Sequence, residues 1–115
     1  MIIDKEVLSY DFSKATNLSG YYFLANCSGY TTIDIQCSWT GINGVGAYVK
    51  YAEKNNVLVI NWDTNRNEMV ILTTTNDSDT IKIKNFDSSL IAVYLEKGNV
   101  TSGILKIRIL TNTVV

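Results

Sequence analysis

Apolar and polar residues alternate along most of this chain, most clearly between residues 90 and 109. The run LIAVYLE at 90–96 sets Ile91, Val93 and Leu95 on one side, and GILKIRI at 103–109 alternates in the same way. A period of two cannot put these side chains on one stripe of a helix, and it is typical of strands with one buried side. Because a short linker with Gly98, Asn99 and Gly103 joins the runs, they predict a two-stranded ribbon with one side in water.

The same pattern predicts strands along the whole chain, while no window keeps the apolar stripe of a helix. Turn-forming Gly, Asn and Asp residues between the strands favour hairpin connections. Short strands at nearly regular spacing predict an all-β fold, in which residues 1–115 form a single antiparallel β-sandwich, jelly-roll or immunoglobulin-like, of eight or nine strands. The predicted strands are Glu6–Tyr10, Tyr21–Asn26, Thr31–Trp39, Ala47–Glu53, Val57–Trp62, Met69–Thr74, Thr80–Lys84, Leu90–Glu96 and Ile104–Leu110.

The edges of the predicted sheets need protection that proline does not give, because the chain contains none. Its edge strands must therefore be guarded by charge, by a bulge, or by pairing with another subunit. The run VLVI at 57–60 is apolar on both sides and uncharged, which indicates a central or covered strand.

Charge and composition restrict the choice of partners. Ten basic residues stand against eleven acidic ones, and they are scattered, so no basic stripe for nucleic acid is visible. Only 18% of residues are charged, and a neutral polar surface is typical of a β domain that meets protein or sugar. No run reaches the roughly 18 apolar residues that span a bilayer, and the start resembles no signal peptide. We expect no membrane partner and folding in a cytosol.

The two cysteines, Cys27 and Cys37, allow one disulfide or none. Cys37 continues the inward alternation of Ile33, Ile35 and Trp39, which favours a free buried thiol that behaves as a small hydrophobic residue. A bridge to Cys27 stays open at this point.

Candidate catalytic chemistry is sparse. The chain has no histidine, which removes the commonest general base and the commonest transition-metal ligand. The run NDSD at 76–79 is a weak calcium candidate, and GINGVG at 41–46 fits a loop of a hairpin better than a phosphate cradle. We expect no catalytic residue, no metal and no cofactor, and a small glycosidase is the least favoured function. Carboxylates available for one, with no pair singled out by spacing, are Asp34, Asp63, Glu68, Asp77, Asp79 and Glu96.

The aromatic residues divide into two groups by their place in the alternation. Trp39 and Trp62 fall on inward positions at strand ends, which indicates core anchors. Tyr22, Tyr48 and Tyr94 fall on outer positions, where tyrosines suit a protein interface or a platform on which a sugar stacks. These three tyrosines are the candidate interface or glycan-stacking residues, beside the alternative of ordinary half-buried surface aromatics.

Three segments carry a resemblance to a known group of proteins: SGYTTIDIQCSWTG at 28–41, INW at 60–62, and IAVYLEKGNVTSGILKIRI at 91–109. Their order resembles that of the small β-sandwich domains of tailed-bacteriophage virion proteins, of the head-decoration, head-fibre and tail-accessory types. In that group a strand that ends in a Thr-Gly turn precedes a hairpin and a tryptophan. A later strand carries a Tyr ahead of a Lys-Gly turn and a Thr-x-Gly.

The resemblance implies a binding function. Such domains dock on a capsid or tail lattice, reinforce it, or present a surface to host glycans. The expectation is therefore a non-enzymatic virion structural protein, a capsid-decorating or head-fibre component made in the bacterial cytoplasm. Its expected partners are other virion proteins and further copies of itself. The alternative is a carbohydrate-binding or adhesin-type module that uses the exposed tyrosines.

Overall fold

A computed structural model describes residues 2–14, 21–54, 69–75 and 77–112, with the backbone alone for 2–7, 21, 22 and 54. The described residues contain strands and no helix, so none of them form a helix that could span a membrane. The predicted strand Val57–Trp62, with its VLVI run and Trp62, lies outside the described residues. The strands are β1 (Ile2–Asp11), β2 (Tyr21–Asn26), β3 (Thr32–Asn43), β4 (Tyr48–Lys54), β5 (Met69–Ile71), β6 (Ser78–Lys84), β7 (Leu90–Glu96) and β8 (Ser102–Asn112).

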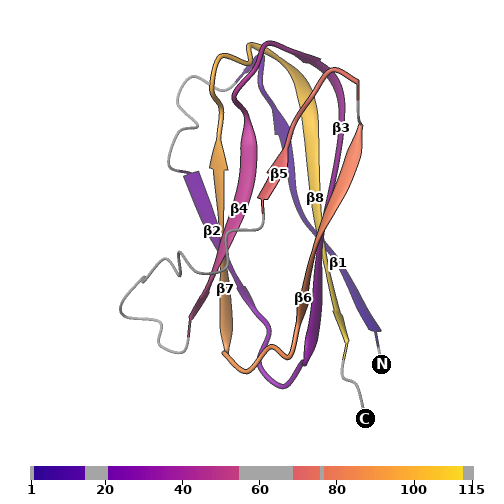
Figure 1. Ribbon diagram of the computed structural model, residues 1–115, viewed down its shortest axis with the longest axis vertical. Coiled ribbons are helices and arrows are strands. Elements are labelled where there is room, and N and C mark those ends of the chain that lie inside the picture. Colours follow the sequence, from indigo (N-terminus) through magenta and orange to yellow (C-terminus); the bar gives the residue numbers. More distant parts are fainter. Residues whose placement is uncertain (1, 15–20, 55–68, 76, 113–115) are drawn as a thin grey trace.

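The described strands form two antiparallel sheets of four strands each (Figure 1). We call them sheet A, with strand order β1-β8-β3-β6, and sheet B, with order β2-β7-β4-β5. The prediction of an all-β antiparallel sandwich is therefore confirmed. The order is that of a jelly roll, because the chain is folded as one long hairpin around the β4–β5 connection and then rolled up. The nested pairs of that hairpin are β1–β8, β2–β7, β3–β6 and β4–β5.

The predicted connections between strands are wrong in this respect. Among the described strands, only β4 and β5 are neighbours both in sequence and in a sheet; the other connections cross between sheets. The two runs between residues 90 and 109 form no ribbon, since β7 lies in sheet B and β8 in sheet A. Alternation identifies the side of a strand that faces the core, but strands of opposite sheets face the same core. Two paired strands of one sheet and two strands that face each other across the core therefore show the same alternation of apolar and polar residues.

The core lies between the sheets and is built from the inward positions that the alternation marks. Ile33, Ile35 and Trp39 of β3 are buried, as are Ile91 and Leu95 of β7. The Trp39 indole N–H donates a hydrogen bond to the Thr73 carbonyl oxygen at 2.8 Å, which joins β3 of sheet A to the segment after β5 of sheet B. The core therefore holds both sheets in one unit.

The glycine-rich loop between β3 and β4 packs against the turn between β7 and β8. Gly98 has φ +57°, and a Cβ on it would lie 2.4 Å from the Gly46 carbonyl carbon, so only glycine fits there. The Asn99 N–H donates to the Val45 carbonyl oxygen at 2.9 Å. GINGVG, predicted as a loop of a hairpin, thus carries the chain from one sheet to the other. Gly44 is crowded by the same turn, because a Cβ on it would lie 2.6 Å from the Asn99 carbonyl oxygen.

Candidate functional site

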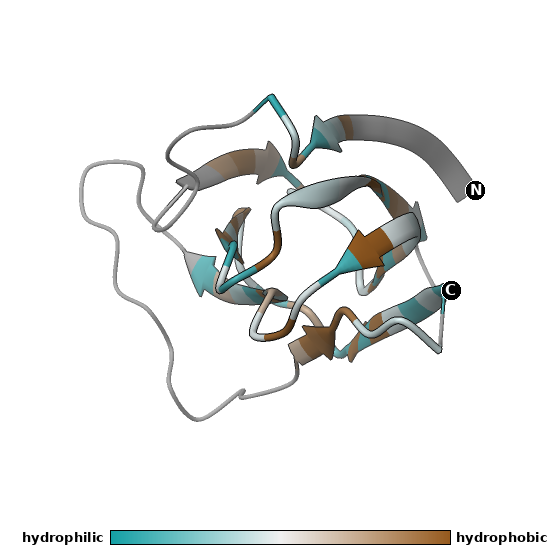
Figure 2. Ribbon diagram, turned by 90° about the horizontal axis from the view of Figure 1, so that it is seen from above, coloured by the Kyte–Doolittle hydropathy of each residue, from teal (hydrophilic) through white to brown (hydrophobic). Residues whose placement is uncertain are grey.

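The outer side of sheet B gathers aromatic and aliphatic side chains from all four of its strands. Backbone register places Tyr48 beside Glu96 and Ile71, and Lys50 beside Tyr94 and Met69. Leu24, Met69 and Ile71 are 42%, 43% and 56% exposed. Figure 2 shows β5 in the brown of hydrophobic residues. We call this surface the tyrosine face, defined by Leu24, Tyr48, Lys50, Met69, Ile71, Tyr94 and Glu96.

Two of the three predicted tyrosines meet at the centre of this face. The rings of Tyr48 and Tyr94 are stacked, with centroids 6.3 Å apart and an interplanar angle of 27°. The Lys50 ammonium lies 4.7 Å from the Tyr94 ring centroid and 5.9 Å from that of Tyr48, within the range of cation–π attraction. The Tyr94 hydroxyl donates to Glu96 Oε2 at 3.0 Å. The cluster is therefore held in place by its own contacts.

The third predicted tyrosine, Tyr22, is placed by its backbone alone. It pairs with Tyr94 in the β2–β7 register, and Tyr94 pairs with Lys50 on its other side. Tyr22 therefore stands at the register position that continues the row of the tyrosine face into β2. Sequence reasoning missed Leu24, Lys50, Met69 and Ile71. The signal was present for β5, where uncharged apolar residues occupy both sides of the strand.

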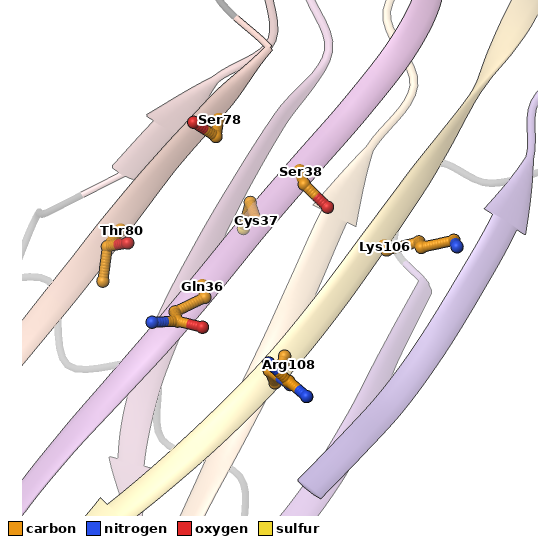
Figure 3. Close-up of a pocket in the computed structure, with 7 residues that line it drawn as sticks. All are labelled: Gln36, Cys37, Ser38, Ser78, Thr80, Lys106 and Arg108. Atoms are coloured by element: carbon orange, nitrogen blue, oxygen red, sulfur yellow. The ribbon is translucent and has the colours of Figure 1, made fainter. Parts of the chain in front are cut away.

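The outer side of sheet A is polar by contrast. A depression of about 490 Å³ lies over β3, β6 and β8 and is lined by short polar side chains and two cations. Figure 3 shows the residues that line it. A second depression of about 480 Å³ adjoins it and shares Ser38, Ser78 and Lys106. Both are open, and the exposed Ile104 borders the second. The lining of the first is Gln36, Cys37, Ser38, Ser78, Thr80, Lys106 and Arg108.

Neither depression holds groups arranged for covalent chemistry. Cys37 contributes to the lining, but its side chain points into the core and is 2% exposed. Burial, and then the negative charge of Asp79, raise the pKa of the Cys37 thiol to about 12, so it remains a thiol at neutral pH. Cys27 and Cys37 are both buried and are not joined by a disulfide, and the alternation predicts this burial for Cys37.

The candidate carboxylates are spread over the molecule rather than gathered. Asp34 lies on β3 of sheet A, Asp77 and Asp79 lie at the start of β6, and Glu96 lies on β7 of sheet B. Within the described ranges, no three His, Cys, Asp or Glu residues lie close enough together to hold a metal ion. This holds for residues 77–79 of the NDSD run, whereas Asn76 lies outside those ranges. Asp63 and Glu68 lie outside those ranges.

Comparison with known proteins identifies no family. No protein-family model and no curated protein matches the chain. Among solved structures, a match is to a protein of Bacillus endospore appendages, described as a novel family of disulfide-linked pili. The sequence identity is 9% and the TM-score 0.40, with 98% of this chain and 89% of that chain covered. A likeness at this level assigns neither family nor function.

Proposed function

We propose that this chain is a non-enzymatic structural component of a protein assembly, and that it docks on its neighbours through the tyrosine face. The observation that carries the proposal is the concentration of Tyr48, Tyr94, Met69 and Ile71 on one side of one sheet. Protein interfaces are enriched in tyrosine and methionine and poor in charge at their centre.

The geometry of the tyrosine cluster suits a docking surface. Tyr94 is held by its bond to Glu96 and by Lys50, so little side-chain freedom remains to be lost on binding. The face carries one described cation and one described anion, Lys50 and Glu96, at neighbouring positions. Such a pair orients a partner without adding a net charge that repels it.

The assembly to examine first is the virion of a tailed bacteriophage. This choice rests on the resemblance of residues 28–41, 60–62 and 91–109 to small virion β-sandwich domains. The sparse charge is compatible with a lattice component. Within a virion, the function is that of a capsid-decorating or head-fibre protein, whose partners are the capsid or tail lattice and further copies of the chain.

The test uses phage particles purified on density gradients from a culture that carries the gene. We expect peptides of this chain in the particle band by mass spectrometry, and we expect added purified protein to cosediment with particles that lack it. Lys50→Glu, which places a carboxylate between the two tyrosines, abolishes cosedimentation. The control Lys106→Glu, on the outer side of sheet A, retains it. Absence of the chain from the particles refutes the virion assignment, and equal binding by both variants refutes the docking face.

A second candidate function is glycan binding, which the closeness of the Tyr48 and Tyr94 rings favours. Aromatic rings offer a sugar an apolar platform, and the Glu96 carboxylate can accept hydrogen bonds from the hydroxyl groups of the sugar. The position of Lys50 opposes this function, because its ammonium already occupies space over the Tyr94 ring. A sugar that stacks there must displace the lysine side chain.

A glycan array separates the two functions. If the face binds sugar, Lys50→Ala opens the rings and strengthens saturable binding, whereas Tyr94→Ala removes it. If the face docks on protein, neither variant binds any glycan.

A further inference from the structure

Four of the described strands lie at sheet edges, and three of them carry recognisable protection against edge-to-edge pairing. β1 contains Asp4, Lys5 and Glu6 in its sequence, and its pairing with β8 shifts register between Glu6 and Leu8. β6 carries charges along its length, at Asp79, Lys82 and Lys84. β5 is only three residues long. Charge, bulges and shortness are the usual ways in which natural sheets protect an edge.

The fourth edge strand, β2, has none of these devices. Its sequence is YYFLAN, with no charge and no proline over six residues. Its pairing with β7 runs from Tyr21 to Asn26 without a register shift. Across the part of the chain that is described, no strand pairs with the outer side of β2. An uncharged, regular edge of this length is a template for another strand.

The hydrogen-bond pattern shows which residues present this template. The Cys27 N–H, one residue beyond β2, donates to the Ser89 carbonyl oxygen at 2.9 Å on the β7 side. Because backbone groups alternate in direction along a strand, the odd-numbered residues of β2 bond to β7. The N–H and C=O groups of Tyr22, Leu24 and Asn26 therefore point to the outer edge.

We propose that β2 pairs with β2 of a second copy of this chain, antiparallel about a two-fold axis at Leu24. This register places Leu24 opposite its counterpart and Tyr22 opposite Asn26, so each facing pair exchanges two N–H···O bonds. The two copies of sheet B then form one continuous sheet. A two-fold interface uses the same surface on both subunits and closes without further growth.

Two features of β2 favour a second copy over a foreign strand. Because the strand is uncharged, its pairing with itself brings no like charges together. Phe23 packs against the core but stays half-buried at the edge, and in the proposed register it faces Ala25 of the other copy. The small Ala25 side chain leaves room for the Phe23 ring, so pairing of the two copies buries the part of Phe23 that stays exposed in the monomer.

The experiment measures the mass of the full chain in solution by sedimentation velocity over a range of concentrations. Wild type forms a dimer. Leu24→Pro removes an outward N–H, costs no bond to β7, and raises the dimer dissociation constant at least about tenfold. Leu24→Ala keeps the N–H and serves as the matched control, which stays dimeric. Circular dichroism establishes that each variant keeps its strands.

A second variant keeps the test decisive if Leu24→Pro fails to fold. Leu24→Lys keeps the backbone N–H and puts two like charges opposite each other at the axis, so it weakens the dimer as Leu24→Pro does. Because Leu24 also belongs to the tyrosine face, Lys50→Glu is measured beside it, and we expect that variant to stay dimeric. A monomeric wild type, or a dimer that survives both substitutions, overturns the proposal. A dimer that Lys50→Glu dissociates, and that Leu24→Pro leaves intact, places the contact on the tyrosine face instead. This outcome overturns the β2 joint and leaves the proposed docking function standing.

Discussion

The two outer sides of the sandwich differ although both sheets are built on the same alternation. Sheet B presents Tyr48, Tyr94, Met69 and Ile71 to the outside, whereas sheet A presents hydroxyl, amide and cationic side chains around open depressions. The inner sides of both sheets are largely apolar, with Thr111 of sheet A as a buried polar exception. The need to pack a core therefore explains the residues on the inner sides. The residues on the outer sides do not pack in the core and are available for binding.

This contrast bears on where a partner attaches. Side chains such as Lys106 and Arg108 on sheet A remain well solvated, and covering them costs their hydration. On sheet B, the exposed apolar area of Leu24, Met69 and Ile71 gains by being covered. We therefore expect the affinity for a partner to depend mainly on residues of the outer side of sheet B.

The largest effect is expected for the feature that the two sheets share, their common core. Ile107→Ala in sheet A and Leu95→Ala in sheet B each remove a fully buried side chain. Each lowers the free energy of unfolding by about 2–5 kcal/mol. Urea unfolding followed by tryptophan fluorescence and circular dichroism measures the loss. Both variants unfold in one transition by both probes; a separate transition for either sheet would show that the sandwich is not a single cooperative unit.

The next effect concerns the hydrogen bond that links the sheets. Trp39→Phe keeps most of the buried ring but leaves the Thr73 carbonyl oxygen without its indole donor. We expect unfolding to become easier by about 1–3 kcal/mol in urea titrations followed by circular dichroism. Phe86→Leu, which reduces the volume of a buried aromatic residue without removing a hydrogen bond, is the comparison; equal losses would mean that volume rather than the Trp39 bond matters.

A third prediction concerns the pH dependence of stability, which we expect to depend on Cys37 of sheet A. In the β3–β6 register this residue lies beside Asp79. Burial and Asp79 raise the pKa of this thiol from its ordinary value of 9.0 to about 12. Between these values the unfolded chain loses the proton and the folded chain keeps it. The contribution is therefore fully present below pH 9 and is lost as the pH rises toward 12, by up to about 1.4 kcal/mol per pH unit.

Urea titrations at pH 8 and at pH 10.5 measure this dependence. Wild type loses more stability between the two pH values than Cys37→Ala, whose own packing defect is the same at both. An identical loss in both proteins would contradict the assigned burial of the thiol.

The smallest effect compares one lysine from each face. Lys50→Met removes the ammonium from the Tyr48 and Tyr94 rings and lowers stability by about 0.5–1 kcal/mol. Lys106→Met on sheet A changes stability by less than about 0.5 kcal/mol. Thermal unfolding at matched protein concentration checks both. A larger loss at Lys106 would reverse the comparison.

The sequence predicts much of the fold because alternation records which side of a strand faces the core. Ile33, Ile35, Cys37 and Trp39 are buried as their spacing predicts. The pairing of strands lies beyond such a pattern, since a strand buries the same side whichever strand lies beside it.

The candidate site was predictable to the same limited degree. Outer positions for Tyr48 and Tyr94 follow from alternation, but their contact depends on the pairing of β4 with β7, which alternation does not encode. Exposure is also mispredicted for Ala92: it shares a side of β7 with Tyr94, which the alternation predicts to face water, and it is fully buried. A side chain as short as that of alanine is buried or exposed according to the neighbouring side chains, which the alternation within its own strand does not describe.

The central place of β8 in sheet A has a consequence for synthesis. β8 lies between β1 and β3, so this sheet has a gap in its middle until β8 leaves the ribosome. A nascent chain that ends before residue 102 exposes the facing edges of β1 and β3 and the inward side chains that β8 covers. Jelly-roll pairing also closes long loops, which slows folding. We therefore expect a chain that is truncated before β8 to be prone to aggregation.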